Sequence, residues 1–368
     1  ELADGTKIPA SQLTWSADSA VTNAAVNDAN KIILYTGEGI APVKATHTAT
    51  NTEVTFCIAQ PDAVTNEVVL YDHTFTTDDL TKDAGGYNVF KADSEWTYWS
   101  DATPDTLKFD IYSDNGGGLC TNKSIADQKV LYYLKPESAQ GKMISRFPDL
   151  TLETVTYVSG NTGRLSGQFF RIDLGNDGFT AVENEQFVHT GIISRTSSSD
   201  KSLVYVYNGT TKLNGDGSYP IYDNAGTSTN LHFGGKIGYM TTRATLEGKK
   251  VTLDYKRSSD IAGTTDVIEA NTITIDLSSK DMKTTAGTVG VGALCYDWDS
   301  RNIAVNSFKA LVTLTADDMA GMKSIAEGGY LFDIVKVDKP VADATVFTYS
   351  GADQTYTVAD NSNYTVTG

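Results

Sequence analysis

The residues of this chain best suited to recognition chemistry are aromatic side chains in polar company. The stretch 96–99 reads Trp-Thr-Tyr-Trp between acidic and hydroxyl residues. Side chains alternate along a strand, so Trp96 and Tyr98 are predicted to point one way and Trp99 the other. Because the neighbouring residues are polar, at most one face of this strand is expected to lie in a core. We expect one of the two tryptophans to anchor a core and the rest of the cluster to contact a ligand.

A second aromatic cluster falls between two predicted strands and is expected to be a loop. Trp298 stands there between Asp297 and Asp299. A large apolar ring between charges on a loop is costly to expose without a use, which favours ligand contact over a loop that folds back on itself. Four further residues of the same loop are assigned to the ligand with it: Tyr296, Asp297, Asp299 and Arg301.

Three tyrosines in turn-like segments complete the candidates. Tyr219 and Tyr222 stand in a loop-like stretch, and Tyr87 follows two glycines. Flat aromatic rings stack on the C–H faces of sugars, while neighbouring Asp, Asn and Arg groups hydrogen-bond the hydroxyls. These clusters therefore indicate a carbohydrate ligand.

The residues of a hydrolytic site are not found at a suitable spacing. Retaining glycosidases need two carboxylates about 5 Å apart. Glu183 and Glu185 form a same-face pair, but they are better explained as a solvated hairpin of an acidic chain. The four histidines stand in separate segments without metal-ligand spacing: His47, His73, His189 and His232. We predict no catalytic residue, and hence no enzyme.

Asp and Asn residues in turns offer oxygen ligands for calcium. The candidates are Asp173, Asn176, Asp177, Asn214 and Asp216. Calcium takes about six to eight oxygens, and each turn supplies only two or three. A structural calcium ion and plain turns both remain open, and no other cofactor is predicted.

Composition limits the partners. The 368 residues include 29 Lys or Arg and 46 Asp or Glu, a net charge of −17. Such a charge opposes binding to nucleic acid or to anionic membrane surfaces. There is no apolar run of the ~20 residues that cross a bilayer, so membrane insertion is not predicted. The chain opens at Glu1 rather than Met, which fits either a processed protein or a segment cut from a longer one.

The three cysteines allow one disulfide with one free thiol, or no disulfide at all. They are Cys57, Cys120 and Cys295. If one bridge forms, we expect it between Cys120 and Cys295.

Apolar residues alternate with polar ones through most of the chain, which predicts an all-β protein. Clear examples are 203–207, 251–255 and 272–277, separated by Gly, Asn and Asp turns. One stretch differs: 316–327 has the spacing of a short helix, with Thr315 as its cap.

Both ends carry a resemblance to the Ig-like repeats of bacterial surface proteins. In residues 1–60 it rests on Leu13-Thr14-Trp15-Ser16 and Lys44-Ala45-Thr46, and in 338–368 on Tyr349 to Gln354. The resemblance implies partial Ig-like units at the two ends, with Trp15 in a core. Residues 316–337 are then a helical turn and a linking strand.

Residues 67–315 resemble concanavalin-like and laminin-G-like jelly rolls. The resemblance is carried by Val69 to Phe75, Gln168 to Leu174, Val204 to Thr210, Val289 to Leu294 and Ile303 to Lys309. It implies one large jelly-roll β-sandwich in which the first and the closing strand lie side by side.

The combination of both resemblances is similar to the starch-adherence surface proteins of gut ruminococci. It implies a non-catalytic, extracellular protein, on a bacterial cell surface or secreted, that captures a polysaccharide, with starch or a related α-glucan foremost. Other surface proteins of a glycan-capture complex are implied partners. Two alternatives stay open: a structural or adhesive segment that binds a host protein, and a polysaccharide hydrolase or lyase with an unrecognised site.

Overall fold

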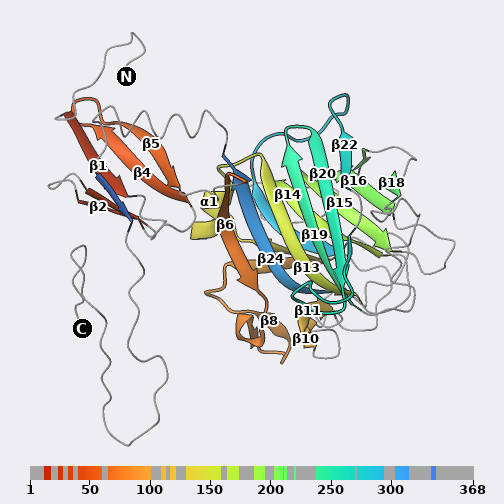
Figure 1. The fold of residues 1–368 in the computed structure, drawn as a ribbon. Coiled ribbons are helices and arrows are strands. Elements are labelled where there is room, and N and C mark those ends of the chain that lie inside the picture. Colours follow the sequence, from red (N-terminus) through yellow and green to blue (C-terminus); the bar gives the residue numbers. More distant parts are fainter. Residues whose placement is uncertain are drawn as a thin grey trace, which may run out of the picture. The chain divides into compact units, whose positions relative to one another are not determined.

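The computed structural model is built almost entirely of β-strands, which confirms the all-β prediction (Figure 1). The described residues are 12–17, 24–27, 32–35, 40–59, 65–100, 109–112, 117–121, 130–158, 164–173, 186–194, 203–209, 211–213, 219–220, 238–269, 272–293, 303–314 and 333–336. Within these ranges no helix has the length and apolar character to cross a membrane.

The chain divides into two compact units. The first combines residues 1–68 with 314–368, and the second is the continuous stretch 69–313. The second unit is therefore inserted, in sequence, into the first. The predicted helix 316–327 and the predicted end unit 338–368 lie outside the described residues.

The first unit holds two small sheets. One joins β1 (Leu13–Ala17), β4 (Ile40–His47) and β5 (Thr52–Ala59), and the other joins β2 (Ala24–Asn27), β3 (Ile32–Tyr35) and β25 (Asp333–Lys336). Trp15 faces Ala45 across the β1–β4 pair and is buried, as predicted.

The strand β25 lies in the segment 316–337, for which a linking strand is predicted. It pairs in parallel with β3, so it adds a strand to the first unit, and the linking role stays a prediction. The identification of the two ends as Ig-like repeats stays a prediction.

The second unit contains a nine-stranded sheet. Its order is β10 (Phe109–Tyr112), β11 (Gly118–Thr121), β24 (Ile303–Thr313), β13 (Leu150–Val158), β19 (Gly238–Glu247), β20 (Lys250–Ser258) and β21 (Ile268–Glu269). Two further strands pair off this path: β22 (Ile273–Asp276) with β20, and β6 (Glu67–Thr74) with β24. The pairing of β6 with β24 confirms that the first and closing strands of this region lie side by side.

An eight-stranded sheet forms the other layer. Its order is β17 (Thr211–Lys212), β16 (Leu203–Asn208), β15 (Gln186–Ser194), β14 (Arg164–Asp173), β23 (Thr288–Ala293), β12 (Val130–Leu134) and β9 (Trp96–Ser100), with β18 (Tyr219–Pro220) beside β16. A separate hairpin pairs β7 (Leu80–Lys82) with β8 (Asn88–Phe90), after the short 3-10 helix η2 (Thr77–Asp79). The helix α1 (Ala139–Ile144) begins at Ser138, whose hydroxyl accepts a hydrogen bond from the Gly141 amide.

The two sheets face each other across a buried layer. Inward side chains of the nine-stranded sheet, such as Leu152, Ala244 and Leu253, have no solvent exposure. From the eight-stranded sheet, Gln168 donates to the Thr154 hydroxyl (2.9 Å) and to the Thr242 carbonyl (3.1 Å). Gln168 therefore points into the sandwich, and its strand neighbours point the opposite way.

Trp96 connects the two sheets at one end of this core. Its indole donates to the Tyr71 hydroxyl (2.8 Å), and its ring meets those of Phe75 and Phe308 edge-on at centroid distances of 4.9 and 5.1 Å. These contacts join β9 of one sheet to β6 and β24 of the other. Only 1% of Trp96 is exposed, so it is the core tryptophan of the 96–99 cluster.

The outer face of the nine-stranded sheet carries a row of alternating charges. Asp72 pairs with Lys309 (3.1 Å), and Glu153 with Arg243 (3.5 Å). Strand register places Lys309 opposite Glu153, and Arg243 opposite Asp254. Acid and base thus alternate across five neighbouring strands, which favours this register over a slipped one.

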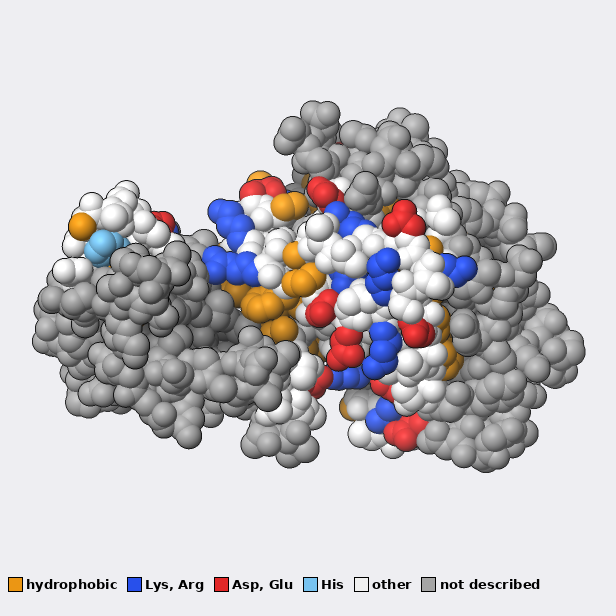
Figure 2. Space-filling view, turned by 90° about the horizontal axis from the view of Figure 1, so that it is seen from above, with side chains coloured by type: hydrophobic (Ala, Val, Ile, Leu, Met, Phe, Trp, Pro, Cys, Tyr) orange, Lys and Arg blue, Asp and Glu red, His pale blue; other side chains and the backbone are white. Residues whose placement is uncertain are grey.

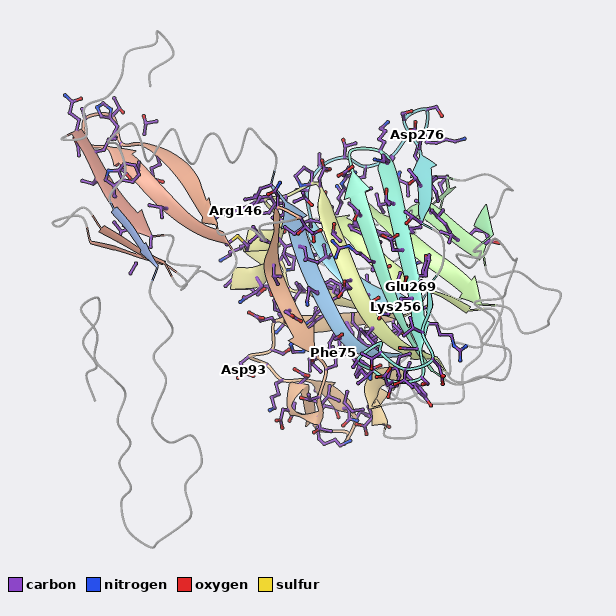
Figure 3. The ribbon with its side chains drawn as sticks, in the orientation of Figure 1. Phe75, Asp93, Arg146, Lys256, Glu269 and Asp276 are labelled. Atoms are coloured by element: carbon purple, nitrogen blue, oxygen red, sulfur yellow. The ribbon has the colours of Figure 1, made fainter. Side chains whose placement is uncertain are left out.

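The same mixing of charge continues beside this row. Lys256 on β20 lies opposite Glu269 on β21 (Figure 3). Seen from above, acidic and basic side chains are interspersed on the visible surface (Figure 2). Such exposed pairs contribute little stability individually, so they bear mainly on register and solubility.

A buried arginine closes one end of the sandwich. Arg171 has a positive φ of 55° at a bulge of β14, and its side chain is 1% exposed. Its guanidinium donates to the Pro148, Lys283 and Gly248 carbonyls and to Asp149 (2.9 Å). One side chain thereby ties β14 to three separate turns.

Candidate functional site

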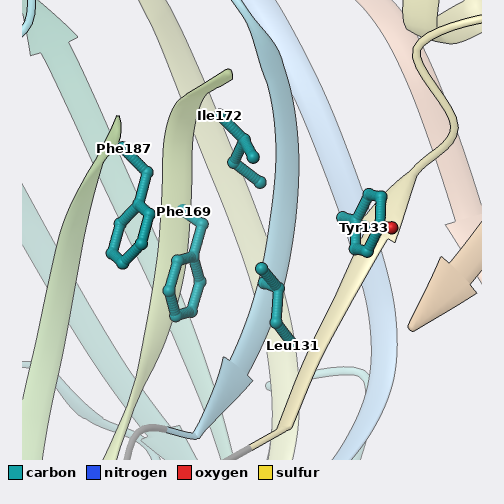
Figure 4. Close-up of a cluster of buried hydrophobic side chains, with 5 residues drawn as sticks. All are labelled: Leu131, Tyr133, Phe169, Ile172 and Phe187. Atoms are coloured by element: carbon teal, nitrogen blue, oxygen red, sulfur yellow. The ribbon is translucent and has the colours of Figure 1, made fainter. Parts of the chain in front are cut away.

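The outer face of the eight-stranded sheet is aromatic and apolar rather than polar. Phe169 and Ile172 of β14, Phe187 of β15, and Leu131 and Tyr133 of β12 form one buried cluster there (Figure 4). Strand alternation directs these side chains away from the nine-stranded sheet, opposite to Gln168. A face outside the sandwich core usually carries polar side chains, so this composition needs an explanation.

Strand register arranges this outer face in two rows. The first row runs Trp99, Leu131, Gly292, Gly167, Gly191, Tyr205. The second runs Thr97, Tyr133, Gly290, Phe169, His189, Tyr207. Three adjacent strands thus contribute glycine to the middle of the first row. We call Gly292, Gly167 and Gly191 the glycine row.

Close approach of the strands requires glycine here. A Cβ at Gly167 would lie 1.6 Å from the Thr190 carbonyl oxygen, and one at Gly292 would lie 2.2 Å from that of Val130. Because these neighbours are backbone atoms, a side chain could not be fitted without moving a strand. The glycine row is therefore a stretch of closely packed backbone without side chains, in which Gly191 and Gly292 are buried and Gly167 is partly exposed.

Aromatic rings stand on both sides of the glycine row. Trp99 lies beyond Leu131 at one end, and Tyr205 and Tyr207 lie on β16 at the other. All three are partly buried and pack against the cluster of Figure 4. Strands are about 4.8 Å apart, so the four steps from Leu131 to Tyr205 span about 19 Å.

His189 lies in the second row, between two aromatic rings. Its imidazole stacks on Phe169 at a centroid distance of 4.2 Å and faces Tyr207 at 6.2 Å. The residue has no solvent exposure, and neither ring nitrogen has a hydrogen-bond partner within the described part of the chain. Burial lowers the pKa of His189 to about 3, so the imidazole is neutral near pH 7.

The tryptophans of the 96–99 cluster take opposite faces, as alternation predicted. Trp99 is on the outer face, whereas Trp96 is in the sandwich core. The assignment of Trp96 as a ligand contact is therefore wrong, because the ring has no free surface to offer. Tyr98 shares the inward side with Trp96 and is partly buried, and burial together with the nearby Asp83 raises its pKa.

Tyr87 belongs to a structured turn between β7 and β8. The Asp83 carboxylate accepts hydrogen bonds from the amides of Gly85 (2.8 Å) and Tyr87 (2.9 Å). The Tyr87 ring packs against Gly85, where a Cβ would come within 2.9 Å of it. These contacts give Tyr87 a structural role, and they do not connect it to the outer face.

Most of the predicted loop contacts are outside the described residues. These are Tyr222, Tyr296, Asp297, Trp298, Asp299 and Arg301, and for Tyr219 only the backbone in β18 is described. Their assignment to a ligand stays a prediction. The same holds for the disulfide, since the side chains of Cys57, Cys120 and Cys295 are not described.

Of the calcium candidates, Asp173 alone is described. Its carboxylate pairs with the Lys283 ammonium at 3.1 Å, which gives this acid a partner other than a metal ion. Asn176, Asp177, Asn214 and Asp216 lie in segments the structure does not describe. Within the described ranges, no group of three or more His, Cys, Asp or Glu side chains could hold a metal ion.

The sequence interpretation missed Tyr133, Tyr205, Tyr207 and His189 as members of one surface. The signal for Tyr205 and Tyr207 was present, because alternation puts both on one side of 203–207. Their position on the same face as Trp99 depends on the order of six strands, from β16 to β9.

Comparison with known proteins finds resemblance only at the level of structure. The sequence matches no family model and no curated protein. The CBM2 module of the Lactobacillus casei BL23 phage J-1 evolved Dit is similar to it, with TM-score 0.34 and 9% identity over 68% of this chain and 97% of that chain.

Two further solved structures are similar to a comparable degree. Peanut lectin has TM-score 0.35 and 12% identity, covering 67% of this chain and 100% of its own. The alginate lyase vAL-1 from Chlorella virus has TM-score 0.32 and 8% identity, covering 60% and 93%. At these values the likenesses carry no argument about function, and the β-sandwich rests on the strands and pairings described above.

Proposed function

We propose that this protein binds a polysaccharide on the outer face of its eight-stranded sheet. The observation that carries the proposal is the set of partly exposed aromatic rings at the two ends of this face. Tryptophan and tyrosine rings supply stacking surfaces for a sugar. Trp99, Tyr205 and Tyr207 are the proposed stacking residues.

The chemistry of sugars fits this surface better than that of a protein ligand. A pyranose ring presents C–H groups on its faces and hydroxyls on its rim, which match apolar rings and a few polar groups respectively. The half-buried tyrosines combine both functions, because each ring carries a hydroxyl at its tip. A span of about 19 Å corresponds to several sugar units rather than one.

The finer points of the proposal rest on the sequence resemblance. We propose starch or a related α-glucan as the first ligand to test, and binding without catalysis. An extracellular location, on a bacterial surface or secreted, completes the proposal, with other surface proteins of a glycan-capture complex as partners. A structural calcium ion at the Asp and Asn turns remains part of it.

The test is affinity gel electrophoresis of the full chain in gels that contain soluble polysaccharides, starch first. Trp99→Ala and Tyr205→Ala should each lower the affinity at least tenfold, which is about 1.4 kcal/mol. Assays for reducing ends and unsaturated products, on each polysaccharide that is bound, should show no turnover.

Tyr239→Ala is the matched control. Tyr239 stacks edge-on with Tyr157 (5.1 Å) on the outer face of the opposite sheet. It should leave the affinity unchanged. If Tyr239→Ala weakens binding while Trp99→Ala and Tyr205→Ala do not, the binding face is the wrong one.

A further inference from the structure

A cluster of ionisable side chains lies where the β7–β8 hairpin joins the sandwich. The Nε2 atom of His73 on β6 is 3.1 Å from the Oδ1 atom of Asp79 at the end of η2, and the two side chains are only 23% and 15% exposed. The Glu95 carboxylate, just before β9, also interacts with the charge of His73. In the described part of the chain, neither acid has a lysine or arginine as an ion-pair partner.

Asp79 is the residue that closes the base of the hairpin. Its Oδ2 atom accepts a hydrogen bond from the Thr76 amide (2.7 Å), while Oδ1 faces His73. Its main-chain carbonyl accepts a hydrogen bond from the amide of Lys91 (3.0 Å), the residue directly after β8. The contact between His73 and Asp79 therefore connects β6 to both strands of the hairpin.

Aromatic rings fix the position of the imidazole. The Tyr71 ring lies parallel to it at a centroid distance of 5.9 Å, and Phe75 meets it edge-on at 4.9 Å. The Tyr71 hydroxyl accepts a hydrogen bond from the Trp96 indole (2.8 Å) and donates one to the Glu95 carboxylate. Burial raises the pKa of Glu95, so the negative charge of this carboxylate is poorly compensated.

The titratable groups around His73 thus come from three elements. They are Tyr71 on its own strand, Asp79 on η2 and Glu95 before β9. Asp72, the neighbour of His73 in sequence, points to the opposite face, where it pairs with Lys309 (3.1 Å). A positive charge on the imidazole would therefore meet two partly buried carboxylates.

We propose that His73 and Asp79 form a pH-dependent latch, in which the charged imidazole holds the β7–β8 hairpin to β6 at weakly acidic pH and the neutral imidazole releases it at alkaline pH. This inference does not depend on the proposed function, because it concerns a different part of the second unit.

The direction of the effect follows from the charges. Histidine is the side chain that ordinarily changes charge between about pH 5 and 8. A contact between an imidazolium and a carboxylate is about twice as strong as the corresponding neutral hydrogen bond. When His73 is neutral, Asp79 and Glu95 share one site without a cation and repel each other. The latch is therefore closed while His73 is charged and both acids are ionised, and it weakens as the pH rises.

The experiment is amide hydrogen exchange of the full chain at pH 6 and pH 8.5. Rates are converted to protection factors, which removes the intrinsic effect of pH on exchange. The Lys91 amide reports on the base of the hairpin. The Leu213 amide, which donates to the Val206 carbonyl (2.8 Å), is the reference in the eight-stranded sheet. We expect the protection of Lys91 to fall at least fivefold relative to Leu213 between pH 6 and pH 8.5.

Two histidine variants provide the comparison. His73→Gln keeps a side-chain donor but cannot be charged, so its Lys91 protection relative to Leu213 should be the same at both pH values. His47→Gln is the matched control, because His47 Nδ1 lies 2.8 Å from the Thr50 hydroxyl in the first unit rather than beside an acid. It should show the same fall at Lys91 as the native chain.

The outcomes decide the proposal directly. A native chain whose relative protection at Lys91 is equal at pH 6 and pH 8.5 has no such latch. If His73→Gln keeps the native fall, another group is responsible and the assignment of His73 is refuted.

A titration of the native chain covers the case in which His73→Gln does not fold. The ring resonances of His73 and the amide resonance of Lys91 are followed by NMR from pH 5 to pH 9. Both should shift with one common midpoint, because protonation of the imidazole acts on Asp79 and through it on Lys91. A Lys91 amide that does not follow the titration of His73 would overturn the latch.

Discussion

Trp96 and Trp99 show how one strand serves two purposes. They are three residues apart, so the pleat sends them to opposite faces of β9, one into the sandwich and one to the outer face. Sequence alternation predicts this divergence. It does not predict which tryptophan is the core one, because that depends on where the second sheet lies.

Replacing these two tryptophans should therefore have different effects. Trp96→Ala should lower the free energy of unfolding by about 3–5 kcal/mol, because it leaves a cavity and removes the hydrogen bond that the Tyr71 hydroxyl accepts from the indole. Trp99→Ala should cost less than half of that, because its ring is partly exposed. Calorimetry on both variants measures the contrast, and equal losses would contradict the assignment of faces.

His189 should also make stability depend on pH. Its pKa is about 3 in the folded chain and near 6.5 when unfolded, so between these values the unfolded state binds the extra proton. This contribution is fully present above pH 6.5 and is lost as the pH falls. At pH 5.5 the loss relative to pH 8 is about 1.4 kcal/mol.

The comparison of native chain and His189→Phe isolates this contribution. Denaturant melts at pH 8 and pH 5.5 should show a decrease in the native chain that is smaller in the variant by about 1.4 kcal/mol. Identical decreases would mean that His189 finds a partner for its charged form.

At the scale of elements, the glycine row should be intolerant of any side chain. Gly167→Ala places a Cβ against the Thr190 carbonyl and forces β14 and β15 apart. We expect a loss of about 2–4 kcal/mol. Thr252→Val, on the outer face of the opposite sheet, is the control and should stay within about 0.5 kcal/mol.

Arg171 holds the end of β14 to its surroundings. Arg171→Met keeps the length of the side chain but removes four hydrogen bonds, three of them to main-chain carbonyls. The expected loss is about 3–5 kcal/mol. Hydrogen exchange should show the Gly248 amide, which donates to Asp149 (2.9 Å), opening first. If the amides of the whole sandwich exchange at one uniform rate instead, the stabilising effect of Arg171 is not local.

The sequence predicted the strands better than it predicted the surface they build. Alternation located 203–207, 251–255 and 272–277 within a residue or three of β16, β20 and β22. The helix at Ala139–Ile144 was missed, since six residues carry too little periodicity. The outer face could not be predicted, because its rows join residues from six strands whose order is determined only by packing.

At the scale of the whole molecule, the second unit should stand alone. Its first and last strands, β6 and β24, are neighbours in one sheet, so cutting at their ends breaks few pairings. A fragment spanning residues 65–315 should fold and keep polysaccharide affinity within about threefold. A fragment that folds but does not bind, beside a full chain that does, would mean that the first unit shares the site.

The parallel pairing of β3 with β25 bears on how this chain would carry a mechanical load. Tension applied before β1 and after β25 pulls β3 and β25 in opposite directions along their length. Their four paired positions are therefore loaded together in shear. The inserted second unit lies outside that path until β3 and β25 separate. A protein tethered at both ends could thus be stretched without a load on the inserted sandwich. Separation of β3 from β25 would lengthen the chain only by the segments outside residues 69–313, while the second unit stays folded.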